Sequence, residues 1–421
     1  MASAEKNYKK QFMKLQKFIS LILVFGITAS SQAETKKLTL EELRGYAFKQ
    51  SPLTKSIELD FATQNKDALE TEALKNPEID FLYAVPAAQR GSDGRGDQPQ
   101  LILSQPIRIS DFGTRGEVSR LIKASASVDQ KLSLLELSQK IRLSFAKVWA
   151  LQERKKLLSS AKARLNKASG IVKKSVAGGL VGDGQALAFE AESNKLEALE
   201  LGLDGEIQES IASLVKLTTY YDTTDITAIR PVSIQIPSEE YLIAKIEDQD
   251  FPPNARSRLR GELADAQYSL AKKDSYPTLT PKFFYGKDPG GFDQVGGGIA
   301  FEIPLWYSNE GEIQRASASK SLSQSQREYF SSDAFKAELL ATRKVALLYE
   351  KQASLYETQV IPKLQQSLKA LSNQYEAGSA SVFEVLQSQR EQISAEGDWL
   401  ELVIKSISAR AELSILTGEE I

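Results

Sequence analysis

The side chains that carry most enzymatic and metal chemistry are missing from this sequence. Its 421 residues include no histidine, no cysteine and only two methionines. The chain therefore has no imidazole proton shuttle, no Ser-His-Asp or Cys-His nucleophile, no disulfide and no thiolate zinc site. Two methionines also leave little soft ligand for copper. We expect no metal site and no cofactor.

Carboxylate chemistry remains open, because aspartate and glutamate are abundant. Two carboxyl groups in a concave pocket suffice for glycoside hydrolysis. In this sequence, however, the acidic residues form only the pairs with basic neighbours that are ordinary on helix surfaces,. An enzyme is therefore the least favoured functional class, and we predict that the chain is not one.

The N-terminus has the pattern of a secretory signal peptide. Lysines precede a short apolar run at 18–27, and Ser31 and Ala33 occupy the small-residue positions before a cleavage site,. A membrane anchor is disfavoured because the run is shorter than the roughly 20 residues that span a bilayer. We predict that 1–33 is a signal peptide and that the exported chain has no lipidated N-terminal cysteine. The exported chain is mildly acidic, which argues against nucleic-acid binding.

Prolines and glycines recur in the same order with a spacing near 200 residues. Pro52 and Pro252 are 200 residues apart, and Gly179 and Gly378 are 199 residues apart. Single pairs mean little, because both residue types mark turns in any chain, but an ordered series indicates duplication. The predicted first copy, linker and second copy cover residues 34–221, 222–240 and 241–421.

Each copy is predicted to contain a helix, two strands, a very long helix, a turn and a last helix. The first helix of each copy ends shortly before a proline, Pro77 or Pro277,. The long helix covers 115–177 in the first copy and 312–375 in the second, where Pro362 is expected to introduce a kink,. Apolar residues in the second copy follow the spacing of a coiled-coil seam, so we expect these helices to pack along their length.

Between the helices of each copy the hydrophobic period changes to two. Four segments have apolar residues on one face and small or polar residues on the other,. A half-buried soluble hairpin would show this alternation, and so would strands of an outer-membrane barrel whose apolar face meets lipid. The predicted strands cover residues 79–85, 101–109, 279–285 and 295–305.

Four strands are too few to close a barrel, since even small barrels need about eight. An open sheet in lipid would leave unpaired edges. The strands are therefore either outside a membrane or part of a barrel that several chains share. A helix of about 60 residues, roughly 90 Å long, is also too long for one chain to bury, which indicates assembly through helix seams.

The order of these features and several local motifs resemble the TolC-type outer-membrane efflux family. The most distinctive motif is YEAGSASVFEVLQSQ at 375–389, which matches the family's Tyr-x-x-Gly turn before the last helix. The Asp-Phe-Gly-x-Arg motif at 111–115 is similar to the branch that exports heavy-metal cations. The other matching segments are LTLEE at 38–42, SQPIRISDFGTRG at 104–116 and FEIPLWYSNEGEIQ at 301–314.

This resemblance implies a mainly α-helical chain with a small β part. Long coiled-coil helical hairpins would form a 12-helix periplasmic tunnel in a homotrimer, and four strands per chain would form a trimeric 12-stranded outer-membrane β-barrel. The implied location is the outer membrane of a Gram-negative-type cell. The implied function is that of a passive exit duct in a tripartite efflux or type I secretion-like system, carrying small molecules or metal cations. The implied partners are a periplasmic adaptor (membrane fusion) protein, an inner-membrane pump and outer-membrane lipid.

The resemblance also implies where the working residues lie. The small residues of two helix turns would form the periplasmic end of the tunnel, where the adaptor docks. Glu384 would form a ring of three carboxylates that attracts cations, and Asp183 and Tyr375 would be hydrogen-bonded gate partners. A simpler alternative is that these are ordinary turn and helix-surface residues. The two turns are Gly178, Gly179, Leu180 and Val181, and Gly378, Ser379, Ala380 and Ser381.

The residues also leave a second functional class open. A periplasmic coiled-coil adaptor or scaffold would explain the helices, but it would not explain four alternating strands in two hairpins. The classes differ in a measurable way. A channel predicts ion conductance in planar bilayers and crosslinkable trimers, whereas a monomer that is water-soluble without detergent would exclude it.

Overall fold

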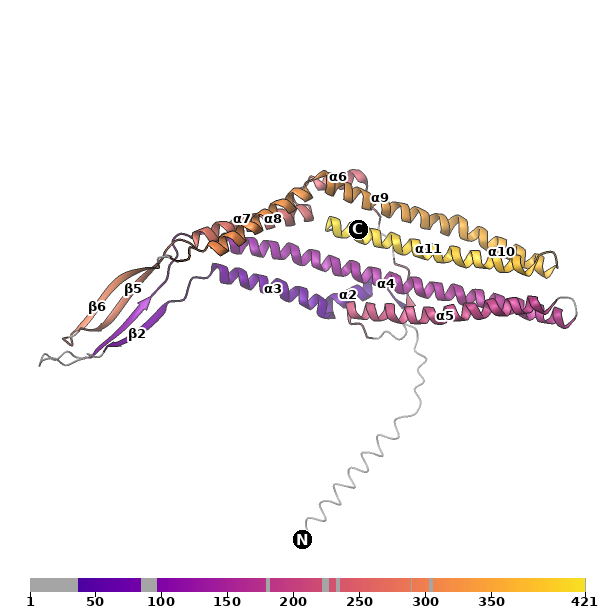
Figure 1. Ribbon diagram of the computed structural model, residues 1–421, viewed down its shortest axis with the longest axis horizontal. Helices are drawn as coiled ribbons and strands as arrows, with labels where there is room; N and C mark the ends of the chain where they lie inside the picture. Colours follow the sequence, from indigo (N-terminus) through magenta and orange to yellow (C-terminus); the bar gives the residue numbers. More distant parts are fainter. Residues whose placement is uncertain are drawn as a thin grey trace, which may run out of the picture.

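The computed structural model describes residues 37–84, 97–178, 182–221, 227–231, 235–288, 290–302 and 306–420. The predicted signal peptide lies outside these residues, as do parts of the predicted linker. The molecule is long and narrow, with a four-stranded sheet at one end and the ends of two helical hairpins at the other (Figure 1).

The helices of the first half are α2 (Leu40–Gln50), α3 (Pro52–Glu72), α4 (Thr114–Ala177) and α5 (Asp183–Thr218). Local capping explains their ends. The Thr39 hydroxyl and the Glu42 carboxylate each accept a hydrogen bond from the other residue's amide, so α2 begins with a capping box,. Ser51 caps α3, and Pro52 occupies its first turn,. α4 has 64 residues, a length of roughly 95 Å, and it forms the first hairpin with α5.

The helices of the second half are α6 (Glu239–Ile246), α7 (Pro252–Lys273), α8 (Glu310–Phe330), α9 (Asp333–Leu355), α10 (Ile361–Glu376) and α11 (Val382–Thr417). The prediction of one continuous helix over 312–375 is wrong. Two residues, Ser331 and Ser332, separate α8 from α9, and the Ser332 hydroxyl caps α9 by accepting from the Phe335 amide. The rings of Tyr329, Phe330 and Phe335 pack together around this break. The serine cap thus satisfies one of the free amides at the start of α9, and the aromatic cluster packs the two helices against each other across the break.

The irregularity expected at Pro362 takes the form of a π-helical turn. The segment η1 (Tyr356–Val360) lies between α9 and α10, directly before the proline. Because proline has no N–H and its ring crowds the preceding turn, the backbone there widens locally instead of ending. α10 and α11 form the second hairpin beyond this point (Figure 1).

The sheet is antiparallel and has the order β2-β3-β5-β6. Its strands are β2 (Glu78–Ala84), β3 (Gln98–Ser104), β5 (Thr278–Lys287) and β6 (Asp293–Glu302), and each overlaps a predicted strand. β3 ends before Ile107, which forms only an isolated bridge to Leu279. The short parallel pair β1 (Lys37–Leu38) and β4 (Thr227–Ala228) ties the start of the chain to the middle.

The main core lies along α4, where α5, α2 and α11 pack against it. Apolar side chains of the first hairpin are almost fully buried, among them Phe145, Leu165, Phe189, Leu196 and Leu214. Burial of such side chains stabilises the fold by about 1.5–3 kcal/mol each. In the described ranges, no helix combines the length and the apolar character that crossing a membrane requires.

Candidate functional sites on the sheet and at the hairpin ends

One face of the sheet is a continuous apolar surface. The register places Ile79 beside Leu103, and Leu103 beside Phe283. The same alternation continues through Phe81, Leu101 and Tyr285, and on β6 through Val295, Ile299 and Phe301. All of these side chains are exposed. Water-soluble proteins rarely leave an apolar patch of this extent uncovered, so this face requires a lipid or protein environment.

The opposite face is more polar, and on β3 and β5 it is better covered. Adjacent residues of a strand point to opposite sides, and on β5 Lys282 and Phe284 are less exposed than their neighbours Phe283 and Tyr285. β3 shows the same difference, with Ile102 more covered than Leu101. Side chains crowd together on the inner side of a curved sheet, so from the difference on β3 and β5 we infer a sheet that curves with its apolar face on the convex side. The concave face carries Glu78, Asp80, Gln98, Gln100, Ser104, Thr278, Thr280, Lys282 and Glu302.

Exposed aromatic side chains gather where the sheet meets the helices. Trp306 is 97% exposed and Tyr307 60% exposed just after β6, and Tyr276 is 63% exposed just before β5. Phe112 lies between β3 and α4 and is 75% exposed. Trp and Tyr side chains are enriched where membrane proteins cross from lipid to water. The junction of the sheet and the helices therefore has the exposed aromatic residues that are typical of a membrane–water interface.

An ionic network fixes the sheet to the helices at the same level. Asp274, at the end of α7, accepts a hydrogen bond from Arg108 at 2.8 Å and from Arg115 at 2.7 Å. Arg115 also contacts the buried Asp111, four residues earlier. The aspartate and arginine of the Asp-Phe-Gly-x-Arg motif therefore pair with each other, and the arginine reaches the other half of the chain.

The turn of the second hairpin has the hydrogen bonds of a Schellman motif. Gly378 has φ of +75°, a left-handed conformation that glycine adopts without strain,. Its amide donates to the Tyr375 carbonyl at 3.0 Å, and the Ser379 amide donates to the Gln374 carbonyl at 2.8 Å,. The predicted turn residues Gly378, Ser379, Ala380 and Ser381 thus form a tight reversal at the exposed end of the molecule.

Glu384 has a structural role that we did not predict, although Ser-x-x-Glu at 381–384 is the sequence signature of a capping box,. The Ser381 amide donates to its carboxylate at 2.6 Å, and the Glu384 amide donates to the Ser381 hydroxyl at 3.3 Å. The two residues form the capping box of α11,. Hydrogen bonds from the backbone and side chain of Ser381 lower the pKa of Glu384. The exposed carboxylate is therefore held ionised at the hairpin end.

Three residues of α5 at helical spacing face the second hairpin. The Tyr375 hydroxyl donates to Gln185 Oε1 at 3.4 Å, and its ring centroid lies 6.0 Å from that of the buried Phe189. Burial raises the pKa of Tyr375. One turn further along α5, Glu192 accepts hydrogen bonds from Arg390 at 3.1 and 2.6 Å. This stripe joins the two hairpins near their ends.

The hydrogen-bond partner of Tyr375 is Gln185, whereas we expected Asp183. Gly182 is the N-cap of α5, so Asp183 is its first residue and is exposed. Two residues correspond to a rotation of about 200° around the helix axis, which separates Asp183 from the stripe that faces Tyr375. In the turn of the first hairpin, the Gly178 amide donates to the Lys174 carbonyl at 3.1 Å. Gly179, Leu180 and Val181 lie outside the described residues.

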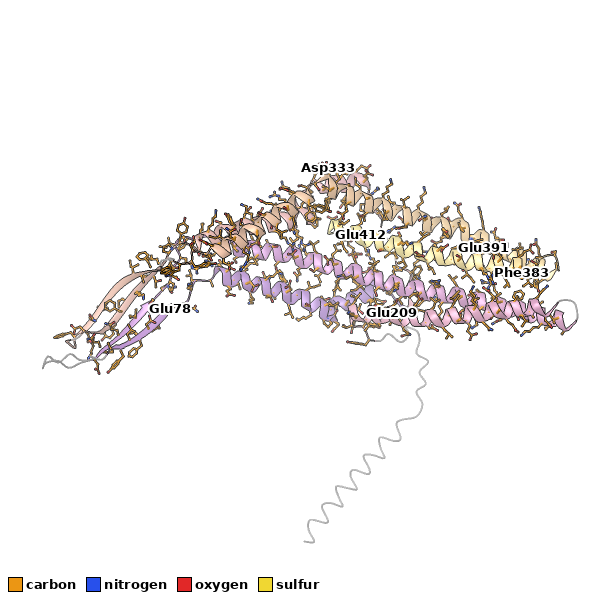
Figure 2. All side chains as sticks on the ribbon, in the orientation of Figure 1. Glu78, Glu209, Asp333, Phe383, Glu391 and Glu412 are labelled. Carbon is orange, nitrogen blue, oxygen red and sulfur yellow. The ribbon has the colours of Figure 1, made fainter. Side chains whose placement is uncertain are left out.

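A groove of about 720 Å³ lies between α5, α10 and α11 and includes the Glu192–Arg390 contact and Glu384 in its lining. Carboxylates, an arginine and the 80%-exposed ring of Phe383 line it. Figure 2 shows Phe383 and Glu391 near the end of the second hairpin. In the part of the chain that the structure describes, no three His, Cys, Asp or Glu side chains are placed to hold a metal ion. The lining includes Glu192, Leu371, Glu384, Gln387 and Arg390.

The segment that follows β4 is fastened to the middle of the bundle by Arg230. Its guanidinium lies 5.9 Å from the ring centroid of Trp149 and 5.4 Å from that of Trp399. It also donates to both carboxylate oxygens of Glu357 in η1, at 2.7 and 3.2 Å. The arginine thereby joins α4, α11 and the π-helical turn. No short motif marked this contact, because its members are far apart in the sequence.

Comparisons with known proteins agree with this architecture. Residues 255–419 match the family model described as outer membrane efflux protein. The outer membrane protein VceC from Vibrio cholerae has a similar structure, with a TM-score of 0.71 at 19% identity over 90% of this chain and 96% of that one. A comparison with curated protein sequences finds no significant match.

Two other solved structures give similar values. The open state of the MtrE outer membrane channel from Neisseria gonorrhoeae has a TM-score of 0.71 at 14% identity, covering 93% of this chain and 94% of that one. A structure of CusC, described in connection with transmembrane channel formation, has a TM-score of 0.73 at 13% identity, covering 92% and 95%. At these identities the likeness shows the fold: long helices with four strands, as predicted.

Proposed function

We propose that this chain is the exit duct of an efflux system, because residues 255–419 match the outer membrane efflux protein family model and the fold is that of the solved outer-membrane proteins. The duct is passive: it conducts cargo through a lumen and catalyses no reaction. Its sheet crosses the outer membrane, and its helices extend into the periplasm. The cargo is delivered by an inner-membrane pump through a periplasmic adaptor, and it consists of small molecules or metal cations.

The observation that carries this proposal is the exposed, convex apolar face of a sheet with two open edges. Within the described residues, β2 and β6 each have a neighbouring strand on one side only. Unpaired backbone groups cost several kcal/mol each in hydrocarbon, so the sheet has to close with further strands. β2 and β6 run in opposite directions, so β6 of one copy can pair with β2 of the next in the same antiparallel pattern. Three copies then form a barrel of twelve strands with an aqueous lumen.

We assign the ends of the two hairpins to the periplasmic entrance of this duct. The contacts of Tyr375 with Gln185 and of Arg390 with Glu192 hold the hairpins together. Asp183 lies at the exposed start of α5, on a different side of this helix from the contact, and three copies of the Glu384 carboxylate form a ring at the entrance. The turns at Gly178–Val181 and Gly378–Ser381 receive the adaptor.

Cysteine crosslinking tests the shared barrel directly. The native chain has no cysteine, so any disulfide must come from introduced residues. Single cysteines along β2, combined with single cysteines along β6, should give covalent dimers and trimers in outer-membrane preparations. Cysteine pairs between β3 and β5 are the control, because these strands already pair within one chain and should give only intramolecular bonds. A monomer that stays in solution without detergent would contradict the proposal.

Planar-bilayer recordings test the duct itself. The purified trimer should insert and conduct ions, because a barrel of twelve strands encloses water. A periplasmic adaptor or scaffold would not insert, and it would give no reason for the curved sheet with its apolar convex face. Absence of conductance from correctly assembled trimers would count against the duct.

A further inference from the structure

On the concave face of the sheet, apolar side chains lie at two adjacent levels among polar ones, and the level further from the helices holds Leu82. At one level across the sheet, the strand register aligns Asp80, Ile102, Phe284 and Gly296 in that order. The next level towards the helices consists of Glu78, Ser104, Lys282 and Gly298. An aromatic ring, a branched aliphatic side chain and a carboxylate therefore share one level of the wall that faces the lumen.

The Phe284 ring lies along this wall and covers Gly296. A Cβ atom added to Gly296 would lie 2.4 Å from Phe284 Cζ and 2.6 Å from Cε1, so close that the ring would have to move. The ring therefore occupies the space directly above the glycine backbone. Phe284 is consequently more covered than its neighbours Phe283 and Tyr285, although it faces the open side of the sheet. A ring that lies down on the wall leaves the lumen open and presents its face to whatever passes.

The charges of the concave face favour a cation. Among the described residues of this face, the three carboxylates of Glu78, Asp80 and Glu302 outnumber one cation, Lys282, which lies two residues before Phe284 on the same strand. Asp80 is two strands away from Phe284, about 10 Å at the usual strand spacing. The face of an aromatic ring attracts positive charge through its quadrupole. An organic cation that is about 10 Å long and carries both an apolar group and a positive charge can contact the Phe284 ring and the Asp80 carboxylate at the same time.

We propose that Phe284 and Asp80 form a contact site for organic cations on the inner wall of the barrel. This inference rests on the proposed function, since it requires that the concave face line a conducting lumen, and it specifies one class of cargo. Phe284 supplies the apolar and π contact, Asp80 supplies the charge, and Gly296 provides the space in which the ring lies flat. Three copies of the site line one barrel.

Block of single-channel current by tetraphenylphosphonium tests the site. This cation combines aromatic groups with one positive charge, and tetraphenylborate has the same shape with the opposite charge. The wild-type channel should be blocked by the cation at lower concentration than by the anion. Phe284→Ala should raise the half-blocking concentration of the cation roughly threefold to tenfold, the range of one cation–π contact. Asp80→Asn should raise it as well and should reduce the preference for the cation.

Phe283→Ala is the matched control, because Phe283 is the adjacent residue of the same type on the convex face. It should leave block unchanged. Equal block by both ions, or equal effects of the two phenylalanine variants, would overturn the site while leaving the duct intact. A wild-type trimer without ion conductance would instead refute the proposed function.

Substitutions of Gly296 and Gly298 provide a second test, in which the Phe284 ring is kept. Gly296→Ala should push the Phe284 ring off the wall and into the lumen, because the added methyl group takes its place. Unblocked conductance should therefore fall, and Phe284→Ala in the same chain should restore it. Gly298→Ala is the control on the same face of the same strand, since nothing lies within 4 Å of a Cβ there. Equal conductance for the two glycine variants would show that the ring does not lie as described.

Discussion

Arg390 of α11 donates two hydrogen bonds to the carboxylate of Glu192 of α5, at 3.1 and 2.6 Å, and so joins the two helical hairpins. Glu192 is only 6% exposed, whereas the Arg390 side chain is half-exposed. The arginine lowers the pKa of Glu192, although burial alone would raise it. The ionised Glu192 therefore lies at the contact between the two hairpins. This contact has to break if the hairpins separate.

We predict that Glu192→Gln raises the open probability of the channel. The amide cannot replace the charge-assisted contact, which is worth about 1.5 kcal/mol at the low end of the range for such bonds. Because the folded-state pKa is lowered, the contact is fully present above the ordinary pKa of about 4.3 and is lost as the pH falls through the lowered value. Wild-type opening should therefore increase in acid, at a pH below the ordinary glutamate pKa of about 4.3,.

Single-channel recordings across pH measure both effects. Glu312→Gln is the matched control, because Glu312 pairs with Arg315 within α8 and joins no hairpins. It should leave opening unchanged at every pH. If Glu192→Gln and the wild type open alike at neutral and acidic pH, the contact does not hold the hairpins.

At Glu384 we predict that the charge and the helix cap can be separated. Glutamine at this position can still accept the Ser381 amide, so Glu384→Gln should keep α11 stable and reduce cation selectivity. Ser381→Ala keeps the charge and should lower the stability of the helix start by about 1 kcal/mol. Reversal potentials in salt gradients and thermal unfolding distinguish the two. Unchanged selectivity in Glu384→Gln would leave the residue with its capping role alone.

The pH dependence of that selectivity has a definite sign. Hydrogen bonds from Ser381 lower the pKa of Glu384, so selectivity should persist below the ordinary glutamate pKa of about 4.3. Ser381→Ala removes the side-chain hydrogen bond and should move the midpoint upwards. A midpoint that stays in place would show that the capping hydrogen bond does not influence the charge.

The strands could be predicted because their signal is local. Alternation of period two identifies Ile79 and Phe81 as members of one face, and a shift of one residue would place both on the other. The apolar face of the sheet can therefore be predicted from the sequence without knowing which strands pair. The same holds for the turn at Gly378, where the left-handed conformation favours glycine,.

The break between α8 and α9 and the partner of Tyr375 were missed for a different reason. Ser332 lies in a stretch without proline or glycine, and the break is stabilised by the rings of Tyr329, Phe330 and Phe335, which meet only after folding. The choice of Gln185 over Asp183 depends on the residue at which α5 begins. An uncertainty of two residues in that start reverses the face of the helix that meets Tyr375.

This choice leads to a prediction at the gate itself. Gln185→Ala should increase channel opening slightly, to about the same extent as Tyr375→Phe, whereas Asp183→Asn should not, because among the described residues it is Gln185, and not Asp183, that contacts the Tyr375 hydroxyl. Tyr375→Phe should have a small effect, since the hydrogen bond is long at 3.4 Å and the ring still packs on Phe189. Tyr375→Ala should have a larger one. Equal opening in the Asp183 and Gln185 variants would contradict this arrangement.

The last prediction concerns the arginine at the middle of the bundle. Arg230→Ala should lower the free energy of unfolding by about 2 kcal/mol, because it removes two stacking contacts and a bidentate pair with Glu357,. Arg230→Lys should recover little, since an ammonium group cannot stack on both Trp149 and Trp399 while it holds two oxygens. Thermal unfolding of the detergent-solubilised trimer measures the loss. Arg315→Ala, which breaks an exposed pair within α8, should change stability by less than about 0.5 kcal/mol. A lysine variant as stable as the wild type would show that charge alone, and not the stacked guanidinium, fastens this segment to α4 and α11.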